Sequence, residues 1–213
     1  VAVFMEGSLF VATALLIGRM GTTAVAAHQV AINVASLAFM VPLGVAMATT
    51  VRVGQAAGRG DAAGVRAAGR AGYAIVLATQ LATAGIMLGF GGPIAGIYTD
   101  DAAVASLATT LLLFAAAFQF PDGIQALSAG ALRGLKDTTW PMAITALSYW
   151  GVGMPLGAWF ALDAGLGWGP QGMWCGLIAG LSMAAALLGW RFRQLTRLPV
   201  PPRPPRVAVT NET

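Results

Sequence analysis

Long apolar segments, separated by short polar or glycine-rich breaks, run through most of this 213-residue chain. Each segment has at least about 17 residues, the minimum that crosses a hydrocarbon core of roughly 30 Å as a helix. The pattern predicts an all-α membrane protein with a bundle of six transmembrane helices. The predicted spans are residues 1–17, 24–51, 71–97, 102–132, 139–162 and 169–190.

The basic residues test this count, because alternating spans place the connections on two sides of the membrane. One side receives the connections 52–70 and 133–137 and the tail from residue 191, which together hold 11 of the 12 basic residues. The other side receives only Arg19. By the positive-inside rule the first side is cytoplasmic. We therefore expect a multi-pass protein of the cell membrane, most simply a bacterial inner membrane, with both ends in the cytoplasm. We also expect 52–70 to be a cytoplasmic connection that could include a short interfacial helix.

Composition agrees with lipid as the main solvent. Apolar residues make up 57% of the chain and charged residues only 9%, whereas a soluble domain carries about 25% charged residues. The 28 glycines suit close packing of helices in a bilayer. The net charge of +4 is explained by membrane orientation, so the bilayer rather than nucleic acid is the expected partner. Residues 196–213 are proline-rich and then polar, which predicts an extended cytoplasmic tail.

The chain begins at Val1, already inside an apolar segment. No charged region or cleavage site precedes that segment, so a signal peptide is not expected. We expect instead a fragment whose upstream part is missing.

Two acidic residues, Glu6 and Asp122, lie inside predicted spans. A carboxylate in hydrocarbon costs several kcal/mol unless it is paired, protonated or hydrated, which makes it a functional candidate. Glu6 precedes Arg19 by about 20 Å of helix and Asp122 precedes Arg133 by about 16 Å, so both are expected near the midplane. Together they could hold a cation, or one could take up a proton. The alternatives are an interfacial position for Glu6 and a helix-capping role for Asp122 after Pro121.

Prolines and amides add to this candidate site. Pro121 lacks an N–H and should free the carbonyl of Ala117, and Pro42 should kink the second span in the same way. Interrupted helices at the midplane are where transporters place ion and substrate sites. Three amides are cavity candidates: Gln119, Gln125 and Asn33. Gln119 and Gln125 flank Asp122 and could donate hydrogen bonds to it.

His28 near the start of the second span could be a proton-coupled switch, although a hydrogen-bonded structural histidine is the commoner case. The lone Cys175 can form neither an internal disulfide nor a metal cluster, and we expect a small packed residue. No nucleotide-binding, hydrolase or metalloprotease motif occurs in the sequence. We therefore expect a transporter rather than an enzyme, with no cofactor and no metal apart from a coupling ion.

Five stretches resemble the multidrug and toxic compound extrusion (MATE) family. They are residues 27–33 (AHQVAIN), 39–44 (FMVPLG), 52–55 (RVGQ), 130–138 (GALRGLKDT) and 170–176 (PQGMWCG). Together they form a long, ordered and specific pattern. The resemblance covers about residues 1–195 and leaves the tail unmatched.

The resemblance is to the C-terminal half of a NorM-like member, and it implies one six-helix lobe of a twelve-helix transporter. Such proteins export organic, often cationic, compounds in exchange for Na⁺ or H⁺. Acids of the seventh and tenth helices help to bind the coupling cation, and these positions look like Glu6 and Asp122. The first lobe of the same protein would be the missing partner. The alternatives are a flippase of lipids or lipid-linked glycans and, with less support, an intramembrane hydrolase. A flippase would line its cavity with basic residues, and no Arg or Lys lies inside a predicted span.

Overall fold

Every regular element in the computed structural model is helical over the part of the chain that it describes. Residues 2–197 are described, with side chains from residue 7 onward. Short turns join the helices. The elements are α1 (Ala2–Gly18), α2 (Thr22–Gly58), α3 (Ala62–Tyr98), α4 (Ala102–Gly134), α5 (Thr139–Ala146), the π-helical segment η1 (Leu147–Gly153), α6 (Met154–Ala161) and α7 (Pro170–Arg197).

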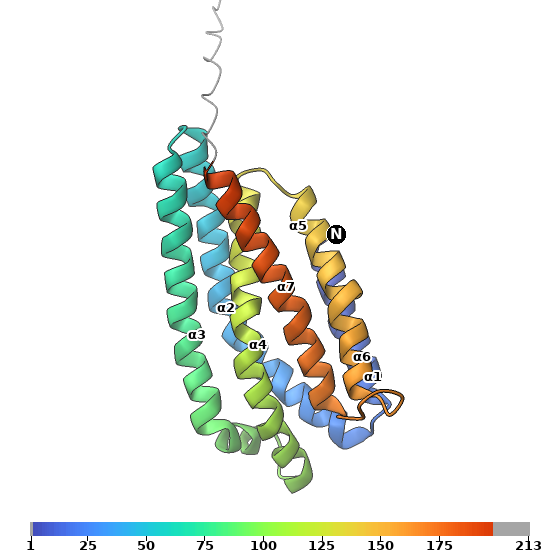
Figure 1. The fold of residues 1–213 in the computed structure, drawn as a ribbon. Helices are drawn as coiled ribbons and strands as arrows, with labels where there is room; N and C mark the ends of the chain where they lie inside the picture. Colours follow the sequence, from blue (N-terminus) through green and yellow to red (C-terminus); the bar gives the residue numbers. More distant parts are fainter. Residues whose placement is uncertain (1, 198–213) are drawn as a thin grey trace, which may run out of the picture.

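The helices run alternately up and down and form one elongated bundle (Figure 1). Four of them, α2, α3, α4 and α7, are long and apolar enough to cross a membrane, which confirms four of the six predicted spans. The first predicted span corresponds to the 17-residue helix α1. The fifth is helical throughout but is divided by η1 into two α-helices of eight residues each.

The expected connection 52–70 is almost entirely helical, which corrects the prediction. Helix α2 continues to Gly58 and α3 begins at Ala62, so only three residues form the turn. Gly60 has a φ of 73°, which permits the reversal. Asp61 then caps α3 by accepting a hydrogen bond from the Gly64 backbone N–H at 2.7 Å. The polar character of this stretch therefore reflects helix ends that extend beyond the apolar part of the bundle.

Proline affects the helices in different ways. Pro42 is buried inside α2, a helix that changes direction along its length (Figure 1). Pro121 lies inside α4, which is continuous across it. Pro93, which the sequence analysis did not single out, lies in α3 three residues after Phe90, whose φ of −126° and ψ of 19° mark a kink. Pro155 is the second residue of α6, so η1 interrupts the fifth span before its proline.

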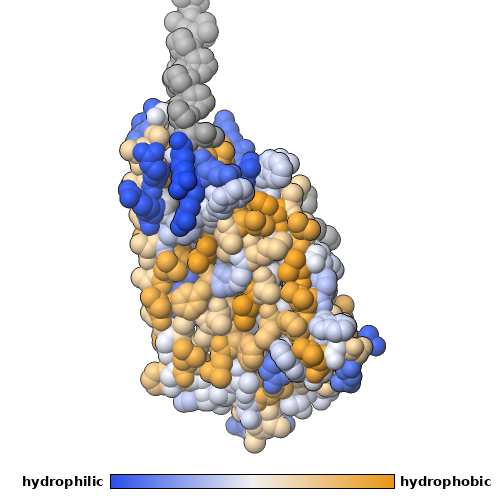
Figure 2. All heavy atoms as spheres, viewed as in Figure 1, coloured by the Kyte–Doolittle hydropathy of each residue, from blue (hydrophilic) through white to orange (hydrophobic). Residues whose placement is uncertain are grey.

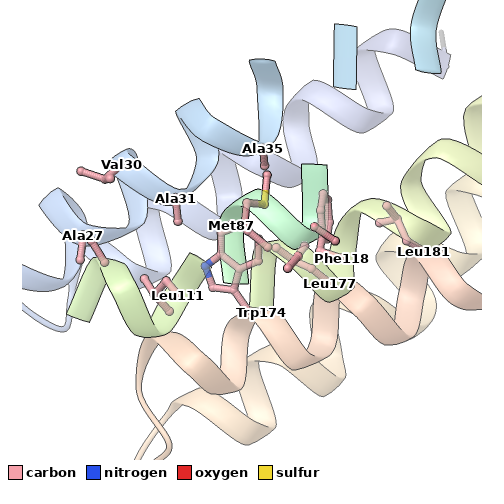
Figure 3. Packing of buried hydrophobic residues seen from close by; sticks show 14 of the residues in the cluster. Ala27, Val30, Ala31, Ala35, Met87, Leu111, Phe118, Trp174, Leu177 and Leu181 are labelled. Atoms are coloured by element: carbon pink, nitrogen blue, oxygen red, sulfur yellow. The ribbon is translucent and has the colours of Figure 1, made fainter. Parts of the chain in front are cut away.

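Helix α4 is the centre of the bundle, packed against α2, α3 and α7. One apolar cluster surrounds Trp174 of α7, which packs between α2 and α4 (Figure 3). The ring of Trp174 meets that of Phe118 edge-on, with 5.5 Å between centroids. Ala27 and Ala31 of α2 let the indole approach that helix closely (Figure 3). Small residues on one helix thus accommodate a large aromatic on another.

Nine described basic residues lie at the helix ends that meet at one end of the bundle. Figure 2 shows hydrophilic side chains gathered at that end over α3 and α7, above a broad apolar surface. Arg19 lies in the turn between α1 and α2, at the opposite end. The separation of charge along the bundle agrees with the predicted partition. The nine residues are Arg52, Arg59, Arg66, Arg70, Arg133, Lys136, Arg191, Arg193 and Arg197.

Candidate cation and substrate site

Asp122 lies in the interior of the bundle, on the central helix. Its side chain is 6% exposed. Because α4 continues without a break from Ala102 to Gly134, Asp122 does not cap a helix at Pro121. A buried acid in the middle of a long apolar helix is costly unless its surroundings compensate for the charge. The burial of Asp122 agrees with the interior position expected from the sequence, and its role in binding a cation stays a prediction.

Polar residues recur every three positions along this part of α4. Gln119, Asp122, Gln125 and Ser128 are all buried. A spacing of three residues turns by about 60° less than a full circle, so these side chains follow a slow spiral around the helix. Together they give the central helix a polar middle section, which is unusual in a helix that is otherwise apolar.

The amide of Gln119 is engaged by α3, a contact that the sequence analysis did not anticipate. Its Oε1 accepts a hydrogen bond from the hydroxyl of Thr83 at 2.7 Å. Its Nε2 donates to the backbone oxygen of Gln80 at 3.3 Å. In return, the Nε2 of Gln80 donates to the backbone oxygen of Gln119. The sequence analysis expected Pro121 to free the carbonyl of Ala117. The carbonyl that α3 contacts is that of Gln119, two residues later.

Gln80 is the main residue that the sequence analysis missed. It is 1% exposed, in the middle of α3. Its amide lies directly against Gly123, the neighbour of Asp122, and any side chain at Gly123 would collide with it. The Oε1 of Gln80 makes no hydrogen bond to a described residue. A signal was present in the sequence, because Gln80 is the only amide in the apolar segment 71–97, and a buried amide in lipid needs a partner.

A second polar contact joins α3 and α4 further along. The hydroxyls of Tyr73 and Ser128 lie 2.7 Å apart. Ser128 Oγ also donates to the backbone oxygen of Ile124 at 2.6 Å. Since a serine hydroxyl has one proton, Tyr73 is the donor in the first bond. Polar contacts between α3 and α4 therefore occur on both sides of Asp122 along the chain.

His28 is 2% exposed and packs against Trp174, with 5.8 Å between ring centroids. Its Nδ1 makes no hydrogen bond to a described residue. The sequence analysis gave a hydrogen-bonded structural histidine as the commoner alternative, and Nδ1 of His28 does not fit it. His28 belongs to the apolar core between α2 and α7.

The other candidates lie elsewhere. Asn33 is exposed on α2, where its amide donates to the backbone oxygen of Gln29 at 2.9 Å. Gln125 is buried on α4. Glu6 belongs to α1, but its side chain lies outside the described part of the structure. The convergence of Glu6 and Asp122 on one cavity stays a prediction. No group of three metal-ligating side chains occurs among the residues searched in the described part.

Comparisons with known proteins agree with this architecture. The model of the MatE family matches residues 1–159. A probable multidrug resistance protein NorM of Xanthomonas campestris pv. campestris is 66% identical over 197 residues, which are 92% of this chain and 43% of that protein. The multidrug resistance protein NorM of Burkholderia vietnamiensis is 46% identical, over 90% of this chain and 42% of that protein. The chain thus spans less than half the length of these relatives.

Solved structures resemble the fold. A crystal structure of a MATE protein in the straight conformation gives a TM-score of 0.84 at 18% identity, and covers 92% of this chain and 44% of that one. A mutant of the Vibrio cholerae MATE transporter VcmN gives a TM-score of 0.82 at 21% identity, with the same coverage of 92% and 44%. At these identities the likeness concerns the fold alone.

Proposed function

This chain belongs to the MatE family, and on that premise we propose that it is the second six-helix lobe of a NorM-like antiporter. The whole protein would export organic, often cationic, compounds in exchange for Na⁺ or H⁺. The lobe would comprise residues 1–195, followed by the tail 196–213. The end of the bundle that carries the nine described basic residues would face the cytoplasm. The family is one of transporters rather than enzymes.

The burial of Asp122 on the central helix carries the proposal. Removing a carboxylate from water favours its protonation or the binding of a cation, so burial at this position would raise the affinity for Na⁺ or H⁺. Glu6 would contribute a second carboxylate, and Gln119 and Gln125 lie one helical turn on either side of Asp122 along α4. Gln119 is already held by α3. A cation that binds here would alter the contacts between α3 and α4.

Coupling between cation binding and transport would follow from the effect of the cation on the α3–α4 contacts. A ligand shifts a conformational equilibrium only through a difference in its affinity for the two states. Neutralising Asp122 would favour one arrangement of the α3–α4 contacts, and an organic cation would compete for the same charge. A flippase is less well supported, because the described basic residues lie at the helix ends and away from the middle of the bundle.

The test measures efflux by the full-length protein in proteoliposomes with an imposed Na⁺ or H⁺ gradient. We expect Asp122→Asn to reduce cation-driven efflux by roughly tenfold or more, which corresponds to about 1.4 kcal/mol of lost coupling. Glu6→Gln should reduce it in the same direction. Comparing Na⁺-free buffer with a collapsed pH gradient identifies the coupling ion.

Asp101→Asn provides the matched control on the same helix. Asp101 caps α4 by accepting hydrogen bonds from Ala103 and Val104, and asparagine caps a helix about equally well. This variant should therefore transport normally. If the double variant Glu6→Gln with Asp122→Asn retained full cation-dependent efflux, the proposed mechanism would be wrong.

A further inference from the structure

Four arginines lie on α3 and α7 near the ends at which these two helices meet. Arg66 and Arg70 are one turn apart on α3, and Arg193 and Arg197 are one turn apart on α7. Residues separated by four positions share a helix face. All four side chains are exposed. Figure 2 shows hydrophilic side chains over the upper ends of α3 and α7, the two helices that carry these arginines.

The two helices touch at the level of these arginines. A Cβ atom added to Gly69 would lie 2.5 Å from the ring of Phe192, so the ring packs on the α3 backbone. The ring of Tyr73 lies 6.5 Å from that of Phe192. Arg66 donates from its guanidinium to the backbone oxygen of Thr196 at 3.2 Å. The helix segments that carry the arginines are therefore held together by a packed junction.

No carboxylate among the described residues neutralises this group. The ion pair within the described chain joins Arg191 to Asp137 and involves none of the four. The nearest acid along α3, Asp61, is occupied by its helix cap. Four positive charges at one junction repel one another and attract an anion. Guanidinium groups match the geometry of phosphate oxygens, which they can bind in pairs.

The surface beside the arginines is apolar and suits a membrane boundary. Trp190, one turn before Arg193 on α7, is 59% exposed, and exposed tryptophans favour the level of the lipid headgroups. On α3, Leu77 and Leu81 follow Arg70 at helical spacing and are also exposed. The junction thus presents cations at one level and apolar side chains below them. An anionic phospholipid is complementary to this arrangement, because its negative headgroup lies above apolar acyl chains.

We propose that the junction of α3 and α7 binds the phosphate headgroup of an anionic phospholipid, with its acyl chains against Leu77 and Leu81. Basic groups at membrane boundaries attract anionic lipids, and the attraction grows with each Lys or Arg near the surface. A site built from four arginines on two packed helices is more selective than basic residues spread along loops. Binding would hold α3 against α7 and would not require transport.

The experiment titrates the full-length protein in detergent with phosphatidylglycerol and counts bound lipids by native mass spectrometry. The test variant is Arg70→Gln with Arg193→Gln, which leaves the Arg66–Thr196 hydrogen bond intact. We expect its apparent affinity for phosphatidylglycerol to fall by roughly tenfold. Phosphatidylcholine, which has no net charge, should bind weakly to both proteins.

The matched control is Arg52→Gln with Arg59→Gln, which removes two exposed charges from the same end of the bundle but outside the junction. It should bind phosphatidylglycerol like the parent. Equal weakening by both pairs, or by neither, would overturn the proposal. Complete displacement of the lipid by millimolar inorganic phosphate would also overturn it, because the ligand of the site would then be free phosphate and not a lipid headgroup. Thermal unfolding of both variants in detergent without lipid verifies that each is folded.

Discussion

Two interfaces in this bundle solve the same packing problem in different ways. Where η1 and α6 meet α7, at Gly153, Gly157, Gly176 and Gly180, backbone lies on backbone. A Cβ on Gly180 would lie 2.8 Å from the Cα of Gly153. At the α3–α4 interface, formed by Gln80, Thr83, Gln119 and Gly123, the helices are joined by side-chain amides and a hydroxyl.

The difference follows from the solvent. Lipid tails are as apolar as leucine, so helices in a bilayer associate through close packing and hydrogen bonds. The glycine interface relies on close packing, which leaves no room to rearrange. The amide interface relies on hydrogen bonds that can exchange partners, and it lies beside Asp122. We therefore expect the first to set stability and the second to respond to cation binding.

The largest effect is expected at the glycine interface, for Gly176→Ala. Its Cβ would lie 2.7 Å from the backbone oxygen of Gly153 and would collide with the backbone of Gly157. Backbone atoms cannot move aside as a side chain would. We expect a loss of about 3 kcal/mol in the free energy of unfolding, the upper end of the usual cost of overpacking. Equilibrium unfolding in mixed detergent micelles measures it.

Gly189→Ala is the control on the same helix. The added methyl group would meet Ser128 and Tyr73 at 3.8 Å, an ordinary contact distance. Its stability should stay within about 0.5 kcal/mol of the parent. Equal losses in the two variants would mean that the close approach of α6 and α7 does not limit stability.

Gln80→Leu is expected to have the next largest effect, at the amide interface. It removes the donor to the Gln119 carbonyl and leaves a polar group without that partner. The cost should be about 1 kcal/mol, typical of a hydrogen bond between membrane helices. Unlike Gly176→Ala, it should also lower cation-driven efflux per folded molecule. Unfolding and transport, measured on the same preparation, separate the two effects.

Thr110→Val serves as the comparison for Gln80→Leu. Its hydroxyl donates only to Ser106 of its own helix, at 3.2 Å, and is exposed. Stability should change by less than about 0.5 kcal/mol. If Gln80→Leu were as stable as this variant and transported normally, the amide interface would have neither of the roles assigned to it.

The α2–α4 interface combines both solutions and gives a smaller effect. A Cβ on Gly130 would lie 2.7 Å from the backbone oxygen of Ala46. The Thr50 hydroxyl lies 2.8 Å from the backbone oxygen of Gly130 on α4 and 2.9 Å from that of Ala46 in its own helix, so its one proton is shared between the two. Thr50→Val should cost about 0.6 kcal/mol, the average for such bonds. Thr109→Val, which loses only a bond to Ala105 in its own helix, should cost less. A larger loss for Thr109→Val would contradict the idea that the bond between helices matters.

The sequence predicted the bundle because lipid imposes a simple rule on composition. Long apolar segments gave four of the spans directly, and the basic residues grouped at one end as expected. Helix ends were harder to predict, because α2 and α3 extend beyond the apolar segments as polar helices. The π-helical segment η1 was not predicted, and its last residue, Gly153, packs closely against Gly176 and Gly180 of α7.

The candidate site was predicted in part, for a similar reason. A lone acid in an apolar segment is easy to recognise in the sequence, and Asp122 is buried as expected. The direction in which an amide points depends on neighbouring helices, so the engagement of Gln119 by α3 did not follow from its position beside Asp122. Asn33 shows the same limit, because its exposed face is set by the packing of α2.

The smallest effect is expected for the ion pair between Arg191 and Asp137, at the charged end of the bundle. Arg191 Nε lies 2.5 Å from Asp137 Oδ2, and its guanidinium lies 5.0 Å from the ring centroid of Trp140. Water reaches the pair in part, because it lies at the charged end of the bundle and the two side chains are 24% and 13% exposed. Asp137→Asn should therefore cost about 0.5 kcal/mol or less at low salt, and less still at 1 M salt. Asp100→Asn, at an exposed acid on the opposite end, provides the baseline. If Asp137→Asn cost more than Thr50→Val, and still did so at high salt, the expected ranking of the two variants would be wrong. A charged contact near water would then contribute more stability than a neutral hydrogen bond inside the bundle.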